Sequence, residues 1–308
     1  MSASAALRAG WKIAASPRSD DLGVNNRVWQ VGRRFWLHCY DPDDLPWRER
    51  QARLVEALGQ VAAREGAELR VPQTVPPLGG GLFHRDEEGA WQLTHNVPGR
   101  RPDPLHGAEY PAVAGGLARL HRLLGQIDPS LAPAPTTLRG DLQANLARHR
   151  AESGDAAFAA MVEPAVERVE AWLPRLLSLP VQVIHGDFSH PNLKLAGRGA
   201  AAELTGVIDF EFCSADPAVL DLATVVLTLL LRGPGRGADA RIGAMLDAYA
   251  AAGGVEVGAD DLWPALLARK LDSYWHHGER ARRDPAARPV AERQVEQLRR
   301  LLGFLDAR

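Results

Sequence analysis

A histidine, an aspartate and an asparagine follow an apolar pair in residues 183–193, which read VIHGDFSHPNL. Asp187 closes the HGD triplet that begins at His185, and Asn192 comes five positions later. In phosphoryl transfer, a carboxylate at such a place orients the acceptor hydroxyl or takes its proton, and an amide five residues later helps hold Mg²⁺ on the nucleotide phosphates. We therefore predict that Asp187 is the catalytic base and that His185, in the same catalytic motif, supports the loop by hydrogen bonding.

A second aspartate ends a later apolar stretch, GVIDF, at residues 206–210. Mg²⁺ prefers hard oxygen ligands and takes only one or two from protein carboxylates, because phosphate and water supply the others. One aspartate and one asparagine are therefore sufficient, so Asp209 and Asn192 are the predicted metal ligands. The alternative is that these residues only cap two strand-to-turn corners, which Asp and Asn commonly do.

The elements that must position these residues divide the chain into a strand-rich part and a helical part. Val, Trp, Phe and Tyr around a VGR turn predict a hairpin from 26–31 and 34–40. Apolar spacing predicts a helix at 46–65. A second hairpin is expected within 82–97, with its turn at EEG.

The helical part is expected to begin after a connector near 94–100. Helices are predicted at 108–124 and, as one or two segments, at 138–179. Two short strands then carry the motifs, and the remainder is helical. These patterns predict two domains, a small strand-rich one at 1–95 and a larger, mostly helical one at 96–308.

Composition excludes some classes of partner. The net charge of −2 provides no field that would attract nucleic acid or an anionic membrane. The longest apolar run, at 219–231, is shorter than the roughly 20 residues that span a bilayer, and it contains Asp221. Two cysteines without ligand spacing, Cys39 and Cys213, suggest a reducing compartment. We therefore expect a cytoplasmic monomer or homodimer.

The motifs HGDFSHPNL and GVIDFEF, followed by ADPAVLDLA, resemble those of the aminoglycoside phosphotransferase-like family. This family includes homoserine, choline and methylthioribose kinases. The resemblance implies a bilobal, α+β, protein-kinase-like fold, with a small β-rich lobe that holds one helix and a larger, mostly helical lobe. It implies that the first of these binds the nucleotide and that the second carries the catalytic and acceptor-binding groups. It also implies ATP, Mg²⁺ and a small acceptor with a hydroxyl group, such as an aminoglycoside, an amino alcohol or a homoserine-like molecule. In such kinases, Asp221 would brace the catalytic loop.

The same resemblance implies which residues face the nucleotide. The backbone of Thr94, His95 and Asn96, in LTHNVPGR, would lie at the adenine. Gly23 and Asn25 would form the turn over the phosphates. GTP in place of ATP stays open.

The sequence departs from the family pattern on the third strand. The family usually carries a lysine or arginine there, but the matching stretch WLHCY puts His38 at that place, and the expected helix glutamate becomes Gln51. Imidazole is shorter than lysine and nearly neutral at pH 7. A pseudokinase that binds a nucleotide or metabolite without turnover is therefore the alternative function.

An acceptor rich in amino groups would need acidic neighbours. The candidates are Glu211, Asp216, Asp260, Asp261, Asp272 and Glu279.

Overall fold

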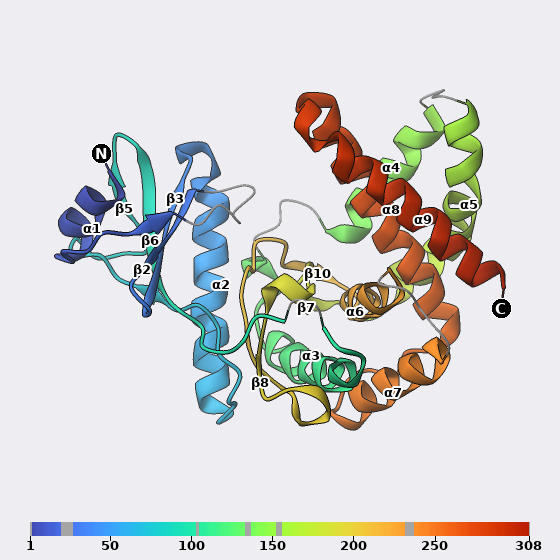
Figure 1. Ribbon diagram of the computed structural model, residues 1–308, viewed down its shortest axis with the longest axis horizontal. Helices are drawn as coiled ribbons and strands as arrows, with labels where there is room; N and C mark the ends of the chain where they lie inside the picture. The colour runs from blue at the N-terminus through green and yellow to red at the C-terminus, as the bar shows by residue number, and fades with distance from the viewer. Residues whose placement is uncertain are drawn as a thin grey trace.

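The N-terminal region is built on an antiparallel sheet (Figure 1). The computed structural model describes residues 2–19, 27–102, 105–132, 137–151, 156–231 and 237–307. The sheet consists of β1 (Arg18–Ser19), β2 (Arg27–Val31), β3 (Phe35–Tyr40), β4 (Thr74–Val75), β5 (His84–Asp86) and β6 (Gly89–His95). The strand order is β1-β2-β3-β6-β4, and β5 pairs with β6.

Both predicted hairpins are confirmed. β2 and β3 pair with Val28 opposite His38, and Gly32 in the connecting turn has a φ of 59°, which glycine adopts without steric cost. β5 and β6 pair with Asp86 opposite Gly89. β3 lies between β2 and β6 and is therefore central to the sheet.

Two helices accompany the sheet, whereas the sequence predicted one. The predicted helix is α2 (Leu45–Arg64), which stands beside the sheet on the side of the C-terminal region (Figure 1). The additional helix is α1 (Ala3–Trp11), which buries Leu7 and Trp11 in a small core with Leu37 and Trp91 of the sheet. The helix count was wrong because nine residues are too few for a stable helix alone, so this helix depends on packing against the sheet that it covers.

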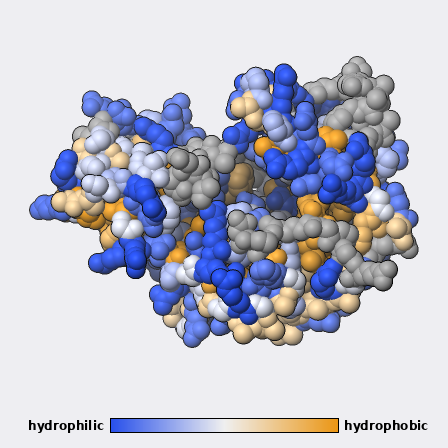
Figure 2. Space-filling view, viewed as in Figure 1, coloured by the Kyte–Doolittle hydropathy of each residue, from blue (hydrophilic) through white to orange (hydrophobic). Residues whose placement is uncertain are grey.

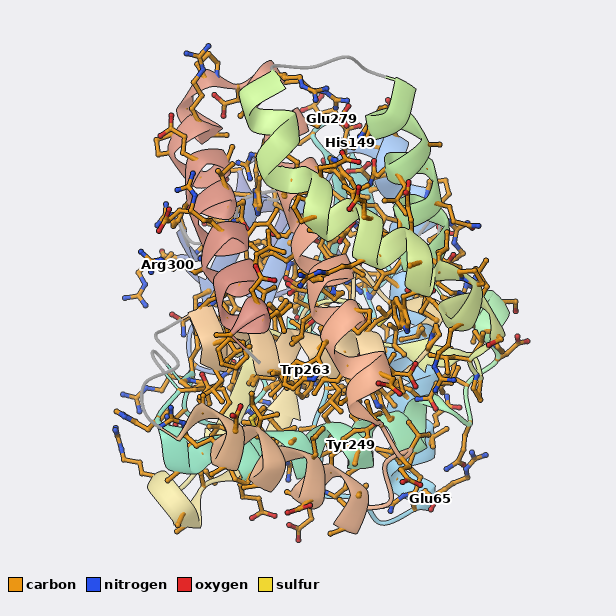
Figure 3. All side chains as sticks on the ribbon, turned by 90° about the vertical axis from the view of Figure 1, so that its right-hand side faces the viewer. Glu65, His149, Tyr249, Trp263, Glu279 and Arg300 are labelled. Carbon is orange, nitrogen blue, oxygen red and sulfur yellow. The ribbon has the colours of Figure 1, made fainter. Side chains whose placement is uncertain are left out.

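The C-terminal region is mostly helical, as predicted. Its helices are α3 (Tyr110–Leu124), α4 (Leu138–Ala151), α5 (Ala156–Ser178), α6 (Val219–Leu231), α7 (Ala238–Ala251), α8 (Ala259–Arg283) and α9 (Arg288–Asp306). His149 of α4 and Glu279 of α8 lie near one end of this helical region, and Tyr249 of α7 lies toward the other (Figure 3).

Two pairs of short antiparallel strands lie within the helical region. β7 (Gln182–Ile184) pairs with β10 (Ser214–Asp216), and β8 (Leu193–Ala196) pairs with β9 (Glu203–Val207). The sequence predicted two of these strands, β7 and β9, because they precede the two aspartate motifs. β7 pairs with β10, which follows Asp209, and β9 pairs with β8, which follows Asn192, so the two strand pairs bring the two motifs to the same place.

α2 shares its core with the C-terminal region. Leu54, Leu58 and Val61 of α2 belong to the same cluster of buried side chains as Leu117 of α3. The apolar run of α6 is buried in that cluster too, which confirms the prediction of a core helix. Within the described ranges, we find no helix with both the length and the apolar character to cross a membrane.

Candidate active site

The catalytic segment, residues 185–192, begins where β7 ends. Ile184 pairs with Ser214 of β10, and the chain then turns sharply at Gly186, which has a φ of 80°. A Cβ atom on Gly186 would lie 2.0 Å from the carbonyl oxygen of Phe212. Only glycine fits this conformation and this close approach, so the turn that presents Asp187 depends on it.

His185 supports the segment from inside. Its side chain is fully buried and packs against Phe210, with ring centroids 4.8 Å apart. Nε2 donates to the carbonyl oxygen of Ile208 at 3.1 Å, and Nδ1 accepts from the backbone N–H of Asp187 at 3.3 Å. Burial lowers the pKa of His185, so the ring is neutral. Because both ring nitrogens are bonded to the backbone, this geometry suits a structural support and not proton transfer.

Asp221, in the first turn of α6, holds the start of the segment. It is fully buried and accepts from the backbone N–H groups of His185 at 2.7 Å and Gly186 at 2.9 Å. It also accepts from Nε2 of His121 at 3.1 Å. Burial by itself would raise the pKa of Asp221, but the hydrogen bond and charge of His121 hold it below its ordinary value. A buried carboxylate with three donors fixes the loop rigidly.

Asn192 and Asp187 are in direct contact. The amide Nδ2 of Asn192 donates to Oδ2 of Asp187 at 2.9 Å and to its carbonyl oxygen at 3.0 Å. The backbone N–H of Ile208 donates to the carbonyl oxygen of Asn192 at 2.9 Å. These bonds orient the Asp187 carboxylate and join the catalytic segment to the chain that carries Asp209.

Asp209 lies at the same place with an unusual backbone. Its φ is 67°, a left-handed conformation that among the described residues only Lys12 shares outside glycine. The side chain is accessible to solvent, yet desolvation by the surrounding chain, followed by the charges of Glu211 and Asp187, raises the pKa of Asp209 to about 7. The structure therefore brings Asp187, Asn192 and Asp209 together in one electrostatic environment.

The charge at this place suits a divalent cation. The carboxyl groups of Asp187, Asp209 and Glu211 interact, and Mg²⁺ would offset the mutual repulsion that adds to burial in raising the pKa of Asp209. Over the part of the chain that the structure describes, no three His, Cys, Asp or Glu side chains form a metal site. A site of one carboxylate and one amide, completed by phosphate and water, does not require three.

At the strand end predicted to face adenine, two backbone N–H groups are already hydrogen-bonded within the N-terminal region. Thr94 is buried, the N–H of His95 donates to the carbonyl oxygen of Gln73 at 2.8 Å, and that of Asn96 donates to Arg34 at 2.8 Å. The predicted phosphate turn with Gly23 and Asn25 lies outside the described residues.

His38 lies on the central strand β3, and its imidazole is uncharged. Its Nε2 is 3.4 Å from the hydroxyl oxygen of Thr94. Its ring stacks on that of Tyr40, with the ring centroids 5.8 Å apart. Burial, followed by the charge of Arg48, lowers the pKa of His38 to about 4. The imidazole is therefore neutral at pH 7.

Comparison with known proteins identifies the family. Residues 18–268 match the model of the phosphotransferase enzyme family, APH. The chain belongs to this family. The match runs from β1 into α8, so it includes both regions, and it confirms the resemblance that the motifs suggested.

Solved structures share the fold of this phosphotransferase at low sequence identity. The GDP and kanamycin complex of APH(2")-IIia has a TM-score of 0.71 at 17% identity, covering 97% of this chain and 98% of that one. The microcompartment-associated aminopropanol kinase has a TM-score of 0.72 at 18% identity, covering 99% and 97%. Macrolide 2'-phosphotransferase MphH from Brachybacterium faecium has a TM-score of 0.61 at 19% identity, covering 91% of each chain. The predicted kinase-like α+β fold is confirmed.

Several side chains at the phosphotransferase site were not predicted. His121 links Asp221 to the hydroxyl of Tyr249, which lies 2.7 Å from Nδ1. Arg48 of α2 pairs with Glu211 at 2.8 Å. These partners are 128 and 163 positions apart, so no local pattern could have revealed the contacts.

The six acidic candidates for an acceptor site have different surroundings. Glu211 pairs with Arg48, Asp216 with Arg139, Asp261 with Arg175 and Glu279 with Arg148, while Asp260 is exposed. Asp272 of α8 lies within electrostatic range of Asp216 and is linked to the catalytic segment through an arginine. Its partner Arg269 donates to the carbonyl oxygen of Gly186 at 2.6 Å.

Asp272 also lies near an acid from another helix. Burial raises the pKa of Asp272, the charge of Arg269 lowers it, and the carboxylate of Asp141 on α4 raises it again. Figure 2 shows a hollow near the centre of this face, over the region where Figure 1 draws α4, α8 and β10. An acceptor with an amino group would find negative charge there.

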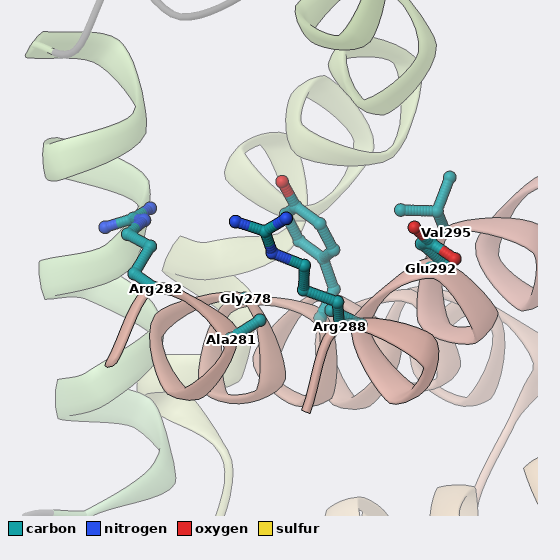
Figure 4. Close-up of a pocket in the computed structure, with 8 residues that line it drawn as sticks. Gly278, Ala281, Arg282, Arg288, Glu292 and Val295 are labelled. Atoms are coloured by element: carbon teal, nitrogen blue, oxygen red, sulfur yellow. The ribbon is translucent and has the colours of Figure 1, made fainter. Parts of the chain in front are cut away.

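A separate pocket lies on the outer helices, away from this site. It has a volume of about 340 Å³ and is formed by α8 and α9 (Figure 4). Tyr274, Arg282 and Arg288 contribute to its lining, and none of the predicted catalytic or metal residues does.

Proposed function

We propose that this phosphotransferase transfers the γ-phosphoryl group of ATP to a hydroxyl of a small molecule in an Mg²⁺-dependent reaction. The observation that carries the proposal is the meeting of Asp187, Asn192 and Asp209 after two strands that the fold brings together. In this proposal residues 1–95 bind the nucleotide, and residues 96–308 provide the catalytic groups and the acceptor site. The backbone carbonyl groups of 94–96 lie at the adenine.

Asp187 performs the proton transfer in the proposed reaction. It accepts the proton of the acceptor hydroxyl while that oxygen forms a bond to the γ-phosphorus. The bond from the γ-phosphorus to the bridging oxygen breaks, and ADP leaves. Asn192 orients the carboxylate through the bond from Nδ2 to Oδ2, and Asn192 and Asp209 would hold Mg²⁺, which stabilises the charge on the phosphates when bound.

The acceptor in this proposal is a small molecule that carries both a hydroxyl and an amino group. Asp272, whose partner Arg269 bonds to the catalytic segment, and Asp141, whose charge acts on Asp272, would attract a cation. Aminoglycosides and amino alcohols both have this chemistry, and relatives in fold include a kanamycin complex and an aminopropanol kinase.

The test is a transfer assay with ATP or GTP, Mg²⁺, and a panel of aminoglycosides, amino alcohols, homoserine and sugars. Asp187→Asn should lower kcat by about 10²- to 10⁴-fold and leave nucleotide affinity nearly unchanged, because the residue acts on the acceptor proton. Asp209→Asn should lower both kcat and the affinity for Mg²⁺. Asp247→Asn, on the exposed side of α7, is the matched control and should match wild type.

The second candidate function is a binding protein without turnover. The neutral His38 on β3 is the observation that favours it, because the strand then lacks the charge that usually holds phosphates. Wild-type protein that binds Mg²⁺–ATP but phosphorylates nothing in the panel would support this alternative and overturn the first.

A further inference from the structure

The strand that carries His38 lies close to the metal residues but supplies no positive charge to them. Tyr40, two positions after His38 on β3, experiences the charges of Glu211 and Asp209. The segment 20–26, DDLGVNN, contains no lysine or arginine. A triphosphate between β3 and Asp209 therefore needs its cation from another element.

Arg48 of α2 places a guanidinium beside this strand. Its side chain is 3% exposed, and within the described residues it is the one buried arginine. The guanidinium lies over the ring of Tyr40 at 4.7 Å and over that of Trp47 at 4.2 Å. Because residues two apart on a strand share a face, Arg48 lies on the same face of β3 as His38.

The same guanidinium reaches the loop after β9. Arg48 donates to Oε2 of Glu211 at 2.8 Å and to Oε1 of Gln51 at 3.0 Å. Trp47 donates to the carbonyl oxygen of Glu211 at 3.2 Å. Glu211 is two residues from Asp209, and the charge of Arg48 acts on the Asp209 carboxylate. Arg48 therefore lies between β3 and the proposed metal ligands.

We propose that Arg48 is the phosphate-binding cation of this protein, taking from α2 the place of the lysine that β3 lacks. Its guanidinium contacts the α- and β-phosphates of the bound nucleotide, and Glu211 and Gln51 position it. The cation thus comes from the helix and not from the strand, and its acidic partner comes from the loop after β9. Guanidinium suits this role because its planar fork of N–H groups can bond to a carboxylate and a phosphate together. The inference rests on the proposed function, since it requires a bound nucleotide.

The experiment compares affinities for nucleotide and nucleoside. In Arg48→Gln, the Kd for Mg²⁺–ATP and Mg²⁺–ADP should rise about 10- to 100-fold, as expected for loss of a charged hydrogen bond. The Kd for adenosine, which lacks phosphates, should stay unchanged. Arg48→Gln leaves Glu211 buried without its cation, so the double variant Arg48→Gln/Glu211→Gln, which is neutral at both positions, is measured too and should show the same selective loss.

A rescue variant and a control complete the design. Adding His38→Lys to the double variant returns a cation to β3 and should restore at least part of the ATP and ADP affinity. Arg85→Gln removes an exposed ion pair with Glu49 of α2 and should change no Kd.

The outcomes separate this inference from the function on which it rests. If wild type binds and uses nucleotide but the Arg48 variants bind ATP as tightly, or lose ATP and adenosine affinity in parallel, Arg48 is only structural and the inference is overturned. If wild type binds neither ATP nor GTP, the proposed function fails, and the inference fails with it.

Discussion

The catalytic segment and strand β3 lie on either side of the proposed nucleotide site, and their polar groups are held in different ways. In the catalytic segment, His185 and Asn192 bond to backbone groups and to Asp187 within a few residues. On β3, the His38 ring lies 3.4 Å from the Thr94 hydroxyl and stacks on Tyr40, and the nearby charge comes from Arg48 on another element. The catalytic side therefore combines bonds within one motif with the buried carboxylate of Asp221, whereas the strand side, in the residues that the structure describes, has no such bonds within its own segment.

The largest expected effect tests how firmly the catalytic side is held. Asp221→Ala leaves the N–H groups of His185 and Gly186 without their buried acceptor and removes the partner of His121. The free energy of unfolding should fall by about 3–5 kcal/mol, measured by urea denaturation. Asp247→Ala, on an exposed helix face, should change it by less than about 0.5 kcal/mol. A comparable loss of unfolding free energy in both variants would mean that Asp221 does not hold the catalytic segment more firmly than an exposed residue holds its helix.

A pH series tests the strand side. The pKa of His38 is about 4 in the folded protein and about 6.5 in an unfolded chain. Between these values the unfolded state binds more protons, so this stability is complete above pH 6.5 and is lost as the pH falls toward 4.

The matched variant isolates this histidine from the others. His38→Gln should remove about 2 kcal/mol of the acid-induced loss, measured as the free energy of unfolding at pH 7.5 and pH 5. Parallel pH curves for the variant and wild type would mean that the ring is not held neutral by its surroundings.

The smallest expected effects come from replacing one glycine in each of two turns, one in the catalytic segment and one beside β3. Gly186→Ala should destabilise the protein by about 2 kcal/mol and lower kcat, because its φ is 80° and the new Cβ would meet the carbonyl oxygen of Phe212. Gly32→Ala, beside β3, has a φ of 59° and open space around it, so it should cost about 1 kcal/mol without affecting kcat. Equal losses of stability and activity would contradict the special role of the catalytic turn.

Local sequence patterns were sufficient to predict most helices and strands and the proximity of the two aspartates and the asparagine. The hairpins, α2 and the later helices have clear strand or helix periodicity, Asp187 and Asp209 each end an apolar stretch, and Asn192 comes five positions after Asp187. A short segment that turns at a glycine and returns to a strand pair leaves few possible arrangements. Residue type and spacing therefore predicted their proximity.

Other features depend on contacts that no local pattern contains. α1 is short and depends on packing against the sheet, and Arg48 resembles any exposed helix arginine until Glu211 is placed beside it. Gln51 was predicted as the partner of His38, but the structure shows it accepting from Arg48. Such side chains acquire their roles through tertiary packing, which spacing along the chain does not encode.

The shared core of α2 has a consequence for motion. Leu54 and Leu58 are buried with the C-terminal helices, whereas Leu37 and Trp91 of the sheet belong to a smaller cluster. Amide hydrogens of α2 should therefore exchange with solvent as slowly as those of α3, and those of the sheet should exchange sooner. Arg48, in the first turns of α2, would then keep its position relative to the C-terminal helices even where the sheet opens locally.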